Sequence, residues 1–170
     1  MVLPEKWEIV RRASEVATQA HQGQVRAGVG AVPYITHPAE VAQILLWHGV
    51  NNMDIVAAAW LHDVVEDTAI TLTDLAPFGP TVTDLVDRLT KLPNQSTDEY
   101  YQRIWESHGA TLIKLADRIS NLRGYHVKGN DKLRRYLAFT EHDYATVRDA
   151  YGLWDTLQDT IQRIRSRRWI

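Results

Sequence analysis

Apolar side chains recur along this chain at the three- and four-residue spacing that is typical of amphipathic helices. In residues 5–21 the apolar positions are Trp7, Val10, Ala13, Ala17 and Ala20. Comparable patterns, bounded by capping residues, glycines and prolines, predict further helices at about 36–49, 53–68, 71–75, 81–90, 97–107, 110–126, 131–151 and 153–168. No stretch has the two-residue alternation of a strand. The sequence therefore predicts an all-α bundle of about eight to nine helices.

Length and hydropathy indicate one domain. The chain has 170 residues, 45% of them hydrophobic, and a chain of this size buries roughly 70% of its unfolded surface. We expect a single domain over residues 1–170, with a core at 5–125 and C-terminal helices at 131–168. The longest apolar run, residues 55–61, is far shorter than the roughly 20 residues that cross a bilayer. The N-terminus also lacks a signal-peptide pattern, so we expect a cytoplasmic protein with no membrane partner.

Composition excludes several classes of function. The chain contains no cysteine, which removes disulfides, thiolate metal sites and a cysteine nucleophile. Its 19 basic and 21 acidic residues give a net charge of −2, whereas nucleic-acid-binding proteins carry a basic excess. We therefore expect no nucleic-acid partner. Six tryptophans, several at helical spacing, are expected in the core or in contacts between subunits of a homo-oligomer.

The predicted helix at 53–68 has an unusual polar end. An apolar stretch runs without interruption into His62-Asp63 and then Glu66-Asp67. In a continuous helix, His62 and Glu66 share one face while Asp63 and Asp67 share the adjoining one. Burying such groups costs several kcal/mol unless they are paired or bind a cation. This cluster is therefore interpreted as part of a metal or catalytic site.

Two other predicted helices supply similar chemistry. His37 stands at the start of the helix at 36–49, and Asp117 lies in the very apolar helix at 110–126. Together with His62 and Asp63 they offer two imidazoles and two carboxylates. This mixed set suits manganese, with zinc or iron as weaker alternatives. A bound divalent ion activates water and polarises phosphoryl oxygens, so hydrolysis of a phosphate ester or pyrophosphate is the expected reaction class.

These residues also have an interpretation that needs no metal ion, in which they form ion pairs. His62 and Asp63 alone could form a satisfied buried ion pair, since such pairs also perturb pKa values. Asp117 could pair with Lys114 or Arg118 on its own helix, and Lys114 could simply extend out of the core. The metal hypothesis gains weight because all of these residues occur together.

The segment at 22–36 lacks helical periodicity and carries Arg26 and Tyr34. It contains Gly23, Gly28, Gly30 and Pro33, which are typical of turns and loops. Long loops in compact domains are usually functional or disordered, and the Pro33-Tyr34-Ile35 sequence is too apolar for disorder. We expect a functional loop; the alternative is that Arg26 and Tyr34 only pack it.

Four strings give the chain a resemblance to a known family. They are AHQGQVRAG at 20–28, VPYITHPAEVA at 32–42, AAWLHDVVEDT at 58–68 and IKLADRISNLR at 113–123. In this order and with these gaps they resemble the HD phosphohydrolase superfamily. Within it they are most similar to the hydrolase domain of RelA/SpoT alarmone enzymes and to the stand-alone small alarmone hydrolases, including the metazoan SpoT homologues. The resemblance spans residues 5 to about 125.

The resemblance implies an HD-domain helical bundle and assigns roles to individual residues. The reaction it implies removes the 3′-pyrophosphate from guanosine tetra- or pentaphosphate, giving GDP or GTP. The implied Mn²⁺ ligands are His37, His62, Asp63 and Asp117. The implied catalytic residues are Glu66 and Asp67, which handle the attacking water, and Asn121. The candidate substrate-binding residues are Arg26, Tyr34, Lys114 and Arg118.

One departure keeps other functions open. The family often has a lysine after the loop arginine, where this chain has Ala27. An alternative hypothesis is therefore the same chemistry on another nucleotide, such as an adenosine alarmone, the 2′-phosphate of NADPH or a nucleoside phosphate. A further alternative is a non-catalytic nucleotide-binding protein. The other histidines, among them His21, have no partner pattern and are expected at the surface or at helix ends.

Overall fold

The computed structural model describes residues 4–26, 31–124, 130–145, 147–149 and 151–166, and Ala27 lies outside them. Within these ranges the chain is helical, and the all-α prediction is confirmed. Only an isolated bridge, between Val25 and Pro33, has strand-like pairing there. The helices are α1 (Glu5–Ala20), α2 (Thr36–Trp47), α3 (Met53–Leu61), α4 (Val64–Asp67), the 3₁₀ helix η1 (Leu72–Phe78), α5 (Pro80–Leu89), α6 (Thr97–Trp105), α7 (His108–Arg123), α8 (Asn130–Asp143) and α9 (Leu153–Ser166).

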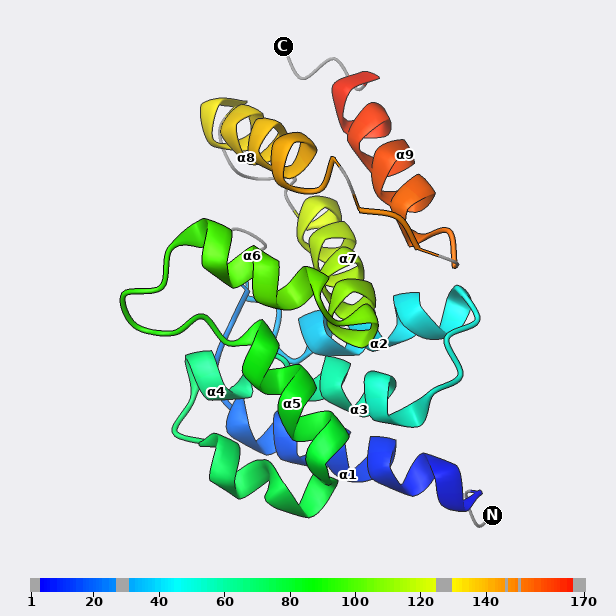
Figure 1. The fold of residues 1–170 in the computed structure, drawn as a ribbon, viewed down its shortest axis with the longest axis vertical. Helices are drawn as coiled ribbons and strands as arrows, with labels where there is room; N and C mark the ends of the chain where they lie inside the picture. The colour runs from blue at the N-terminus through cyan, green and yellow to red at the C-terminus, as the bar shows by residue number, and fades with distance from the viewer. Residues whose placement is uncertain (1–3, 27–30, 125–129, 146, 150, 167–170) are drawn as a thin grey trace.

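The α3 helix lies at the centre of the core. It packs against α1, α2, α5 and α7 (Figure 1). Its Ala57, Ala58 and Ala59 are completely buried, as are Ala13 and Ala17 on α1. Because these side chains are small, neighbouring helices can approach α3 closely, and burial of the apolar faces stabilises the packing. The polar residues that follow α3 therefore begin inside the molecule.

The prediction of one continuous helix at 53–68 is wrong. The α3 helix ends at Leu61, a turn follows at His62-Asp63, and α4 begins at Val64. At the turn, the Nδ1 atom of His62 lies 2.8 Å from the carbonyl oxygen of Ala59, which a continuing helix would use for the N–H of Asp63. The four polar side chains of this segment therefore do not share the faces of one straight helix.

Two predicted boundaries also differ from the structure. The helices predicted at 97–107 and 110–126 leave Gly109 between them, but Gly109 lies inside α7, where an added Cβ atom would be 2.9 Å from Cδ2 of Leu85. The glycine therefore permits close packing of α7 on α5. The helix predicted at 131–151 ends at Asp143. Downstream, the Asp149 carboxylate accepts hydrogen bonds from the backbone N–H groups of Tyr151, Leu153 and Trp154 and so caps the start of α9.

Of the tryptophans in the described residues, one is largely exposed and the others pack partly against the core. Trp47, at the end of α2, is 77% exposed. The tryptophans that pack against the core while remaining partly accessible are Trp7, Trp60, Trp105 and Trp154. Self-association of the chain stays a prediction. In the described part of the chain no helix is both long enough and apolar enough to span a membrane.

Arg118 joins three helices through one buried guanidinium group. Its nitrogens donate hydrogen bonds of 2.9–3.2 Å to the hydroxyl groups of Tyr101, Thr140 and Tyr144. The group also lies 4.3 Å from the ring centroid of Tyr136. A cation surrounded by hydroxyls and aromatic rings is well compensated for its burial. Arg118 therefore holds α6, α7 and the region around α8 together.

We expect Arg118→Met to lower the free energy of unfolding by about 3 kcal/mol, because it leaves buried hydroxyl groups without partners. Urea denaturation measures the change. The matched control is Arg134→Met, whose side chain is 76% exposed and whose substitution should change stability by less than about 0.5 kcal/mol. Equal denaturation midpoints for the two variants would contradict this role for Arg118.

Candidate metal centre

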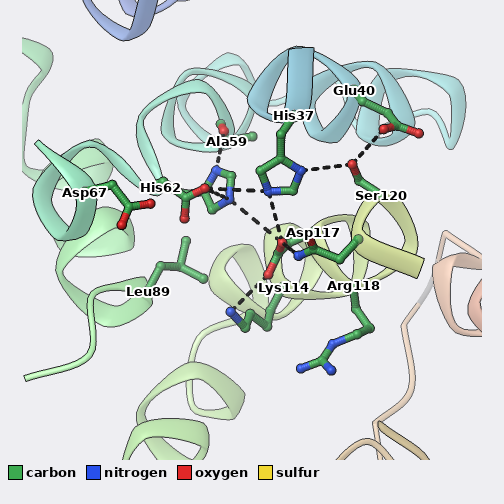
Figure 2. A network of polar contacts seen from close by, with 12 residues as sticks. His37, Glu40, Ala59, His62, Asp67, Leu89, Lys114, Asp117, Arg118 and Ser120 are labelled. Carbon is green, nitrogen blue, oxygen red and sulfur yellow. Dashed lines mark hydrogen bonds and ion pairs between the residues drawn. The ribbon is translucent and has the colours of Figure 1, made fainter. Parts of the chain in front are cut away.

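Three segments of the chain bring His37, His62 and Asp117 together (Figure 2). Asp63 lies against both histidines. His37 is in the first turn of α2, His62 and Asp63 form the turn after α3, and Asp117 is in the middle of α7. The Nε2 atom of His37 lies 3.2 Å from Oδ1 of Asp117 and 3.5 Å from Oδ2 of Asp63. The Nε2 atom of His62 lies 3.1 Å from Oδ2 of Asp63 and 4.0 Å from Oδ1 of Asp117. Two nitrogens and two carboxylate oxygens therefore face a common point.

The histidine orientations fit a cation at that point. Nδ1 of His62 is directed at the Ala59 carbonyl, which can only accept a hydrogen bond, so the ring proton belongs on Nδ1 and the lone pair on Nε2. When the ring is neutral, this buried Nε2 atom faces the Asp63 carboxylate at 3.1 Å and, within the described residues, receives no hydrogen bond from a donor. His37, His62 and Asp63 can each offer a ligand atom within 4.8 Å of the others. A buried nitrogen lone pair without a donor is what a divalent metal would satisfy.

The electrostatics of the pocket also favour positive charge. Burial lowers the pKa of His62, but Asp63 and Asp117 together raise it by more, to about 9. Burial and the neighbouring Asp117 raise the pKa of Asp63, but His62 and His37 together lower it by more, and the net pKa falls well below the usual range. Both carboxylates are thus ionised, and they favour a proton on His62 when no other cation is bound. A metal ion would replace that proton, because a ligating imidazole must be neutral.

Asp117 is held from its own helix as well as facing the histidines. Its Oδ2 atom lies 3.0 Å from Nζ of Lys114, and its Oδ1 atom accepts a hydrogen bond from the side-chain amide of Asn121. Burial raises the pKa of Asp117, but Lys114 and His37 lower it by more, so the net pKa lies well below normal. The pairing with Lys114 and the position facing His37 are therefore compatible. Lys114 and Asn121 orient a candidate ligand.

Tyr34 connects the candidate ligands to the acidic pair of α4. Its hydroxyl group donates its single proton to Oδ2 of Asp63 at 2.6 Å, and Oδ2 of Asp67 lies 3.2 Å from the same hydroxyl oxygen. The backbone carbonyl of Asp67 accepts a further bond from Gln24. Glu66 turns to a different partner and accepts a 2.7 Å hydrogen bond from the backbone N–H of Lys91. The two acidic side chains are thus held by separate contacts.

The four predicted substrate-binding residues lie in different surroundings. Tyr34 lies at the candidate site, and Lys114 is paired with Asp117. Arg26 lies 3.3 Å from the carboxylate of Glu40 and contacts the backbone oxygen of Ser120. Arg118 uses its guanidinium group in the packing described above, and this arrangement gives no support to a substrate contact there.

Three residues near the centre were not predicted from the sequence. His21 lies at the end of α1, as the helix-end alternative predicted, but it is only 2% exposed, and its ring centroid lies 4.7 Å from that of Tyr34. Glu40 and Ser120 form a hydrogen-bonded pair beside His37. Spacing carried a signal for all three. His21 follows the buried Ala17 by four residues, and Glu40 and Ser120 each lie three residues after a candidate ligand, in each case on the same helix face.

Comparison with known proteins identifies the protein family of this chain. Residues 13–110 match the HD domain family. This match covers more than half of the chain and agrees with the helical fold and the His/His/Asp cluster. The chain belongs to the HD domain family.

Three individual proteins show which members of the family this chain is similar to. The chain is 35% identical over 158 residues to the guanosine-3′,5′-bis(diphosphate) 3′-pyrophosphohydrolase of Vibrio cholerae, covering 86% of this chain and 22% of the relative. It is 39% identical over 118 residues to the mouse enzyme of that name, MESH1, covering 65% of this chain and 66% of the relative. A solved metazoan orthologue of SpoT, described as hydrolysing ppGpp, superposes with a TM-score of 0.81 at 26% identity, covering 96% and 98% of the two chains.

These comparisons confirm the predicted resemblance to the SpoT-type hydrolases. They also differ in coverage. The chain spans about a fifth of the length of bacterial relatives such as the Vibrio enzyme, whereas it matches nearly the whole of the solved metazoan chain.

We expect a divalent metal to stabilise the folded protein. A ligand at 100 times its Kd adds about 2.7 kcal/mol to the free energy of unfolding, which corresponds to a rise in Tm of roughly 5–10 °C for a chain of this size. Thermal denaturation with Mn²⁺ and with EDTA measures the shift. Asp63→Asn should remove it. An equal metal-induced shift in that variant would place the metal elsewhere.

Proposed function

We propose that this chain is a metal-dependent hydrolase that removes the 3′-pyrophosphate of guanosine tetra- or pentaphosphate, giving GDP or GTP and pyrophosphate. The observation that carries the proposal is the convergence of two imidazole nitrogens and two carboxylate oxygens at one buried point. The names of the Vibrio and mouse relatives support the substrate class. The near-complete superposition on a ppGpp hydrolase supports it further.

The proposed ligands are His37, His62, Asp63 and Asp117, and the proposed metal is Mn²⁺, with Zn²⁺ or Fe²⁺ as alternatives. Two imidazoles and two carboxylates form a mixed nitrogen and oxygen set, which manganese accepts readily. When bound, the ion would lower the pKa of water and polarise phosphoryl oxygens. The protein's own contribution is to hold the four ligand side chains at one point, with donors from Tyr34, Asn121 and Lys114 orienting the two carboxylates.

In this proposal the acidic side chains of α4 handle the attacking water. Tyr34 fixes the Asp67 carboxylate, and the backbone N–H of Lys91 fixes that of Glu66. Burial raises the pKa of Glu66, although the Lys91 hydrogen bond opposes this. A carboxylate with a raised pKa is a better proton acceptor than an ordinary one. Glu66 is therefore suited to accept the proton of water, with Asp67 orienting it.

The predicted substrate and catalytic contacts form the remainder of the proposal. Asn121, which donates to Asp117, acts chiefly by orienting that ligand. Tyr34 and Lys114 contact the candidate ligands, and Arg26 lies beside Glu40 and Ser120; in this proposal they supply hydroxyl and cationic groups for a phosphorylated nucleotide. We further propose that the core at 5–125 and the C-terminal helices act as one domain. Support comes from the hydrophobic cluster, which includes residues from Val10 to Ile161.

Substitutions of Asp63 and Glu66 distinguish the loss of metal binding from the loss of turnover. We expect Asp63→Ala to abolish Mn²⁺ binding in calorimetry and therefore hydrolysis. Glu66→Gln should bind Mn²⁺ with unchanged affinity but lose roughly 10²–10⁴-fold in kcat, the usual contribution of a general base. Glu106→Gln, at the exposed C-cap of α6, is the matched control and should retain both. Metal-dependent hydrolysis by Asp63→Ala would refute the ligand assignment.

A nucleotide panel with Mn²⁺ tests the substrate. Released pyrophosphate and phosphate are measured separately, because their ratio identifies the bond that is cleaved. The proposal predicts pyrophosphate from guanosine tetraphosphate at a higher kcat/KM than from any other nucleotide. Faster turnover of an adenosine alarmone, NADPH or a nucleoside phosphate would reassign the substrate. A protein that binds metal but hydrolyses none of them would be a nucleotide-binding protein without catalysis.

A further inference from the structure

A chain of hydrogen bonds leads away from the candidate metal centre on the far side of His37 (Figure 2). Nδ1 of His37 lies 3.0 Å from the hydroxyl oxygen of Ser120, and that hydroxyl donates to Oε2 of Glu40 at 2.7 Å. Ser120 is completely buried and His37 is 4% exposed. Water therefore has little access to the contact between His37 and Ser120, and its direction is decided by the protein.

The direction follows from counting protons. A carboxylate only accepts hydrogen bonds, so Glu40 takes the single hydroxyl proton of Ser120. The Ser120 oxygen then has only lone pairs to offer to His37, and Nδ1 of His37 must be the donor. A neutral imidazole with its proton on Nδ1 has its lone pair on Nε2. That is the nitrogen that faces Asp63 and Asp117.

The opposite tautomer would disable the site. With the proton on Nε2, His37 would donate to Oδ1 of Asp117, only 3.2 Å away. This bond is favourable in itself, but it occupies both a ligand nitrogen and a ligand oxygen. The carboxylates alone would therefore favour a form of His37 that cannot bind metal. The contact on the Nδ1 side must oppose that preference.

Two arginines keep Glu40 in place as the end of the chain. The guanidinium of Arg26 lies 3.3 Å from Oε2 of Glu40, and that of Arg123 lies 3.8 Å from Oε1. Arg26 also lies 3.4 Å from the backbone oxygen of Ser120. These cations balance the charge of Glu40 and leave its oxygens as acceptors. Arg26 thus contributes to the orientation of both partners.

We propose that Glu40 and Ser120 are positioning residues that hold His37 in the Nδ1–H tautomer and so present Nε2 to the metal. This inference rests on the proposed metal-dependent function. Outer contacts of this kind affect metal affinity by about 10- to 100-fold. The effect does not require either residue to touch the metal or the substrate.

The experiment measures the tautomer and the metal affinity separately. Two-dimensional ¹H–¹⁵N NMR of the imidazole groups in the metal-free protein identifies which nitrogen of His37 carries the proton. Calorimetry gives the Kd for Mn²⁺. Ser120→Ala, which leaves the charge unchanged, and Glu40→Met, which frees the Ser120 hydroxyl to donate to His37, should both move the proton to Nε2. Both should also raise the Kd about 10- to 100-fold.

Matched controls are Ser14→Ala and Glu15→Met on the outer part of α1, which should change neither quantity. Thermal denaturation without metal shows whether each variant is folded, and if one variant fails to fold the other still gives both measurements. An Nε2–H tautomer in the wild-type protein, or an unchanged Kd in the folded variants, would overturn the inference. Absence of Mn²⁺ binding to the wild-type protein would instead refute the proposed function, while the tautomer measurement would still decide the role of Glu40 and Ser120.

Discussion

Asp63 and Asp117 place two ionised carboxylates in a buried region beside the apolar centre of the molecule, and much of the surrounding structure compensates for this charge. Lys114 pairs with Asp117, Tyr34 donates to Asp63, and two imidazole rings face both carboxylates. Burial without such partners would cost several kcal/mol for each charge. The arrangement keeps both groups ionised and accessible to a cation, which a simple pair of buried acids would not do.

The break between α3 and α4 makes this arrangement possible. The α3 helix is packed on several sides, so a side chain projecting from its middle would meet another helix. By ending the helix at Leu61, the chain places His62 and Asp63 in a turn whose side chains converge with His37 and Asp117. The helix then resumes as α4 and carries Glu66 and Asp67 to the edge of the site. One local change of direction thus separates the candidate ligands from the candidate water-handling residues.

Sequence reasoning predicted the helices well because their periodicity is strong, and the four ligand candidates were predicted because their combination is rare in an apolar setting. It failed where tertiary contacts decide the outcome. A glycine between two apolar stretches is typical of a helix break, yet Gly109 lies inside α7 and permits close packing of that helix on α5. The burial of Arg118 among hydroxyls and aromatic rings from other helices was likewise not predicted, while its role as a substrate contact stays a prediction. Neither environment could be deduced from residues adjacent in sequence.

The stretches 24–26 and 32–34 are joined to each other by backbone hydrogen bonds and contact the rest of the molecule at two separate places. Gln24 and Tyr34 contact Asp67 on α4, while Arg26 contacts Glu40 on α2 and Ser120 on α7. Because the two stretches are paired, a displacement of one would be transmitted to the contacts of the other. A nucleotide that displaces them would therefore alter the surroundings of a water-handling carboxylate and of the partners of His37 together.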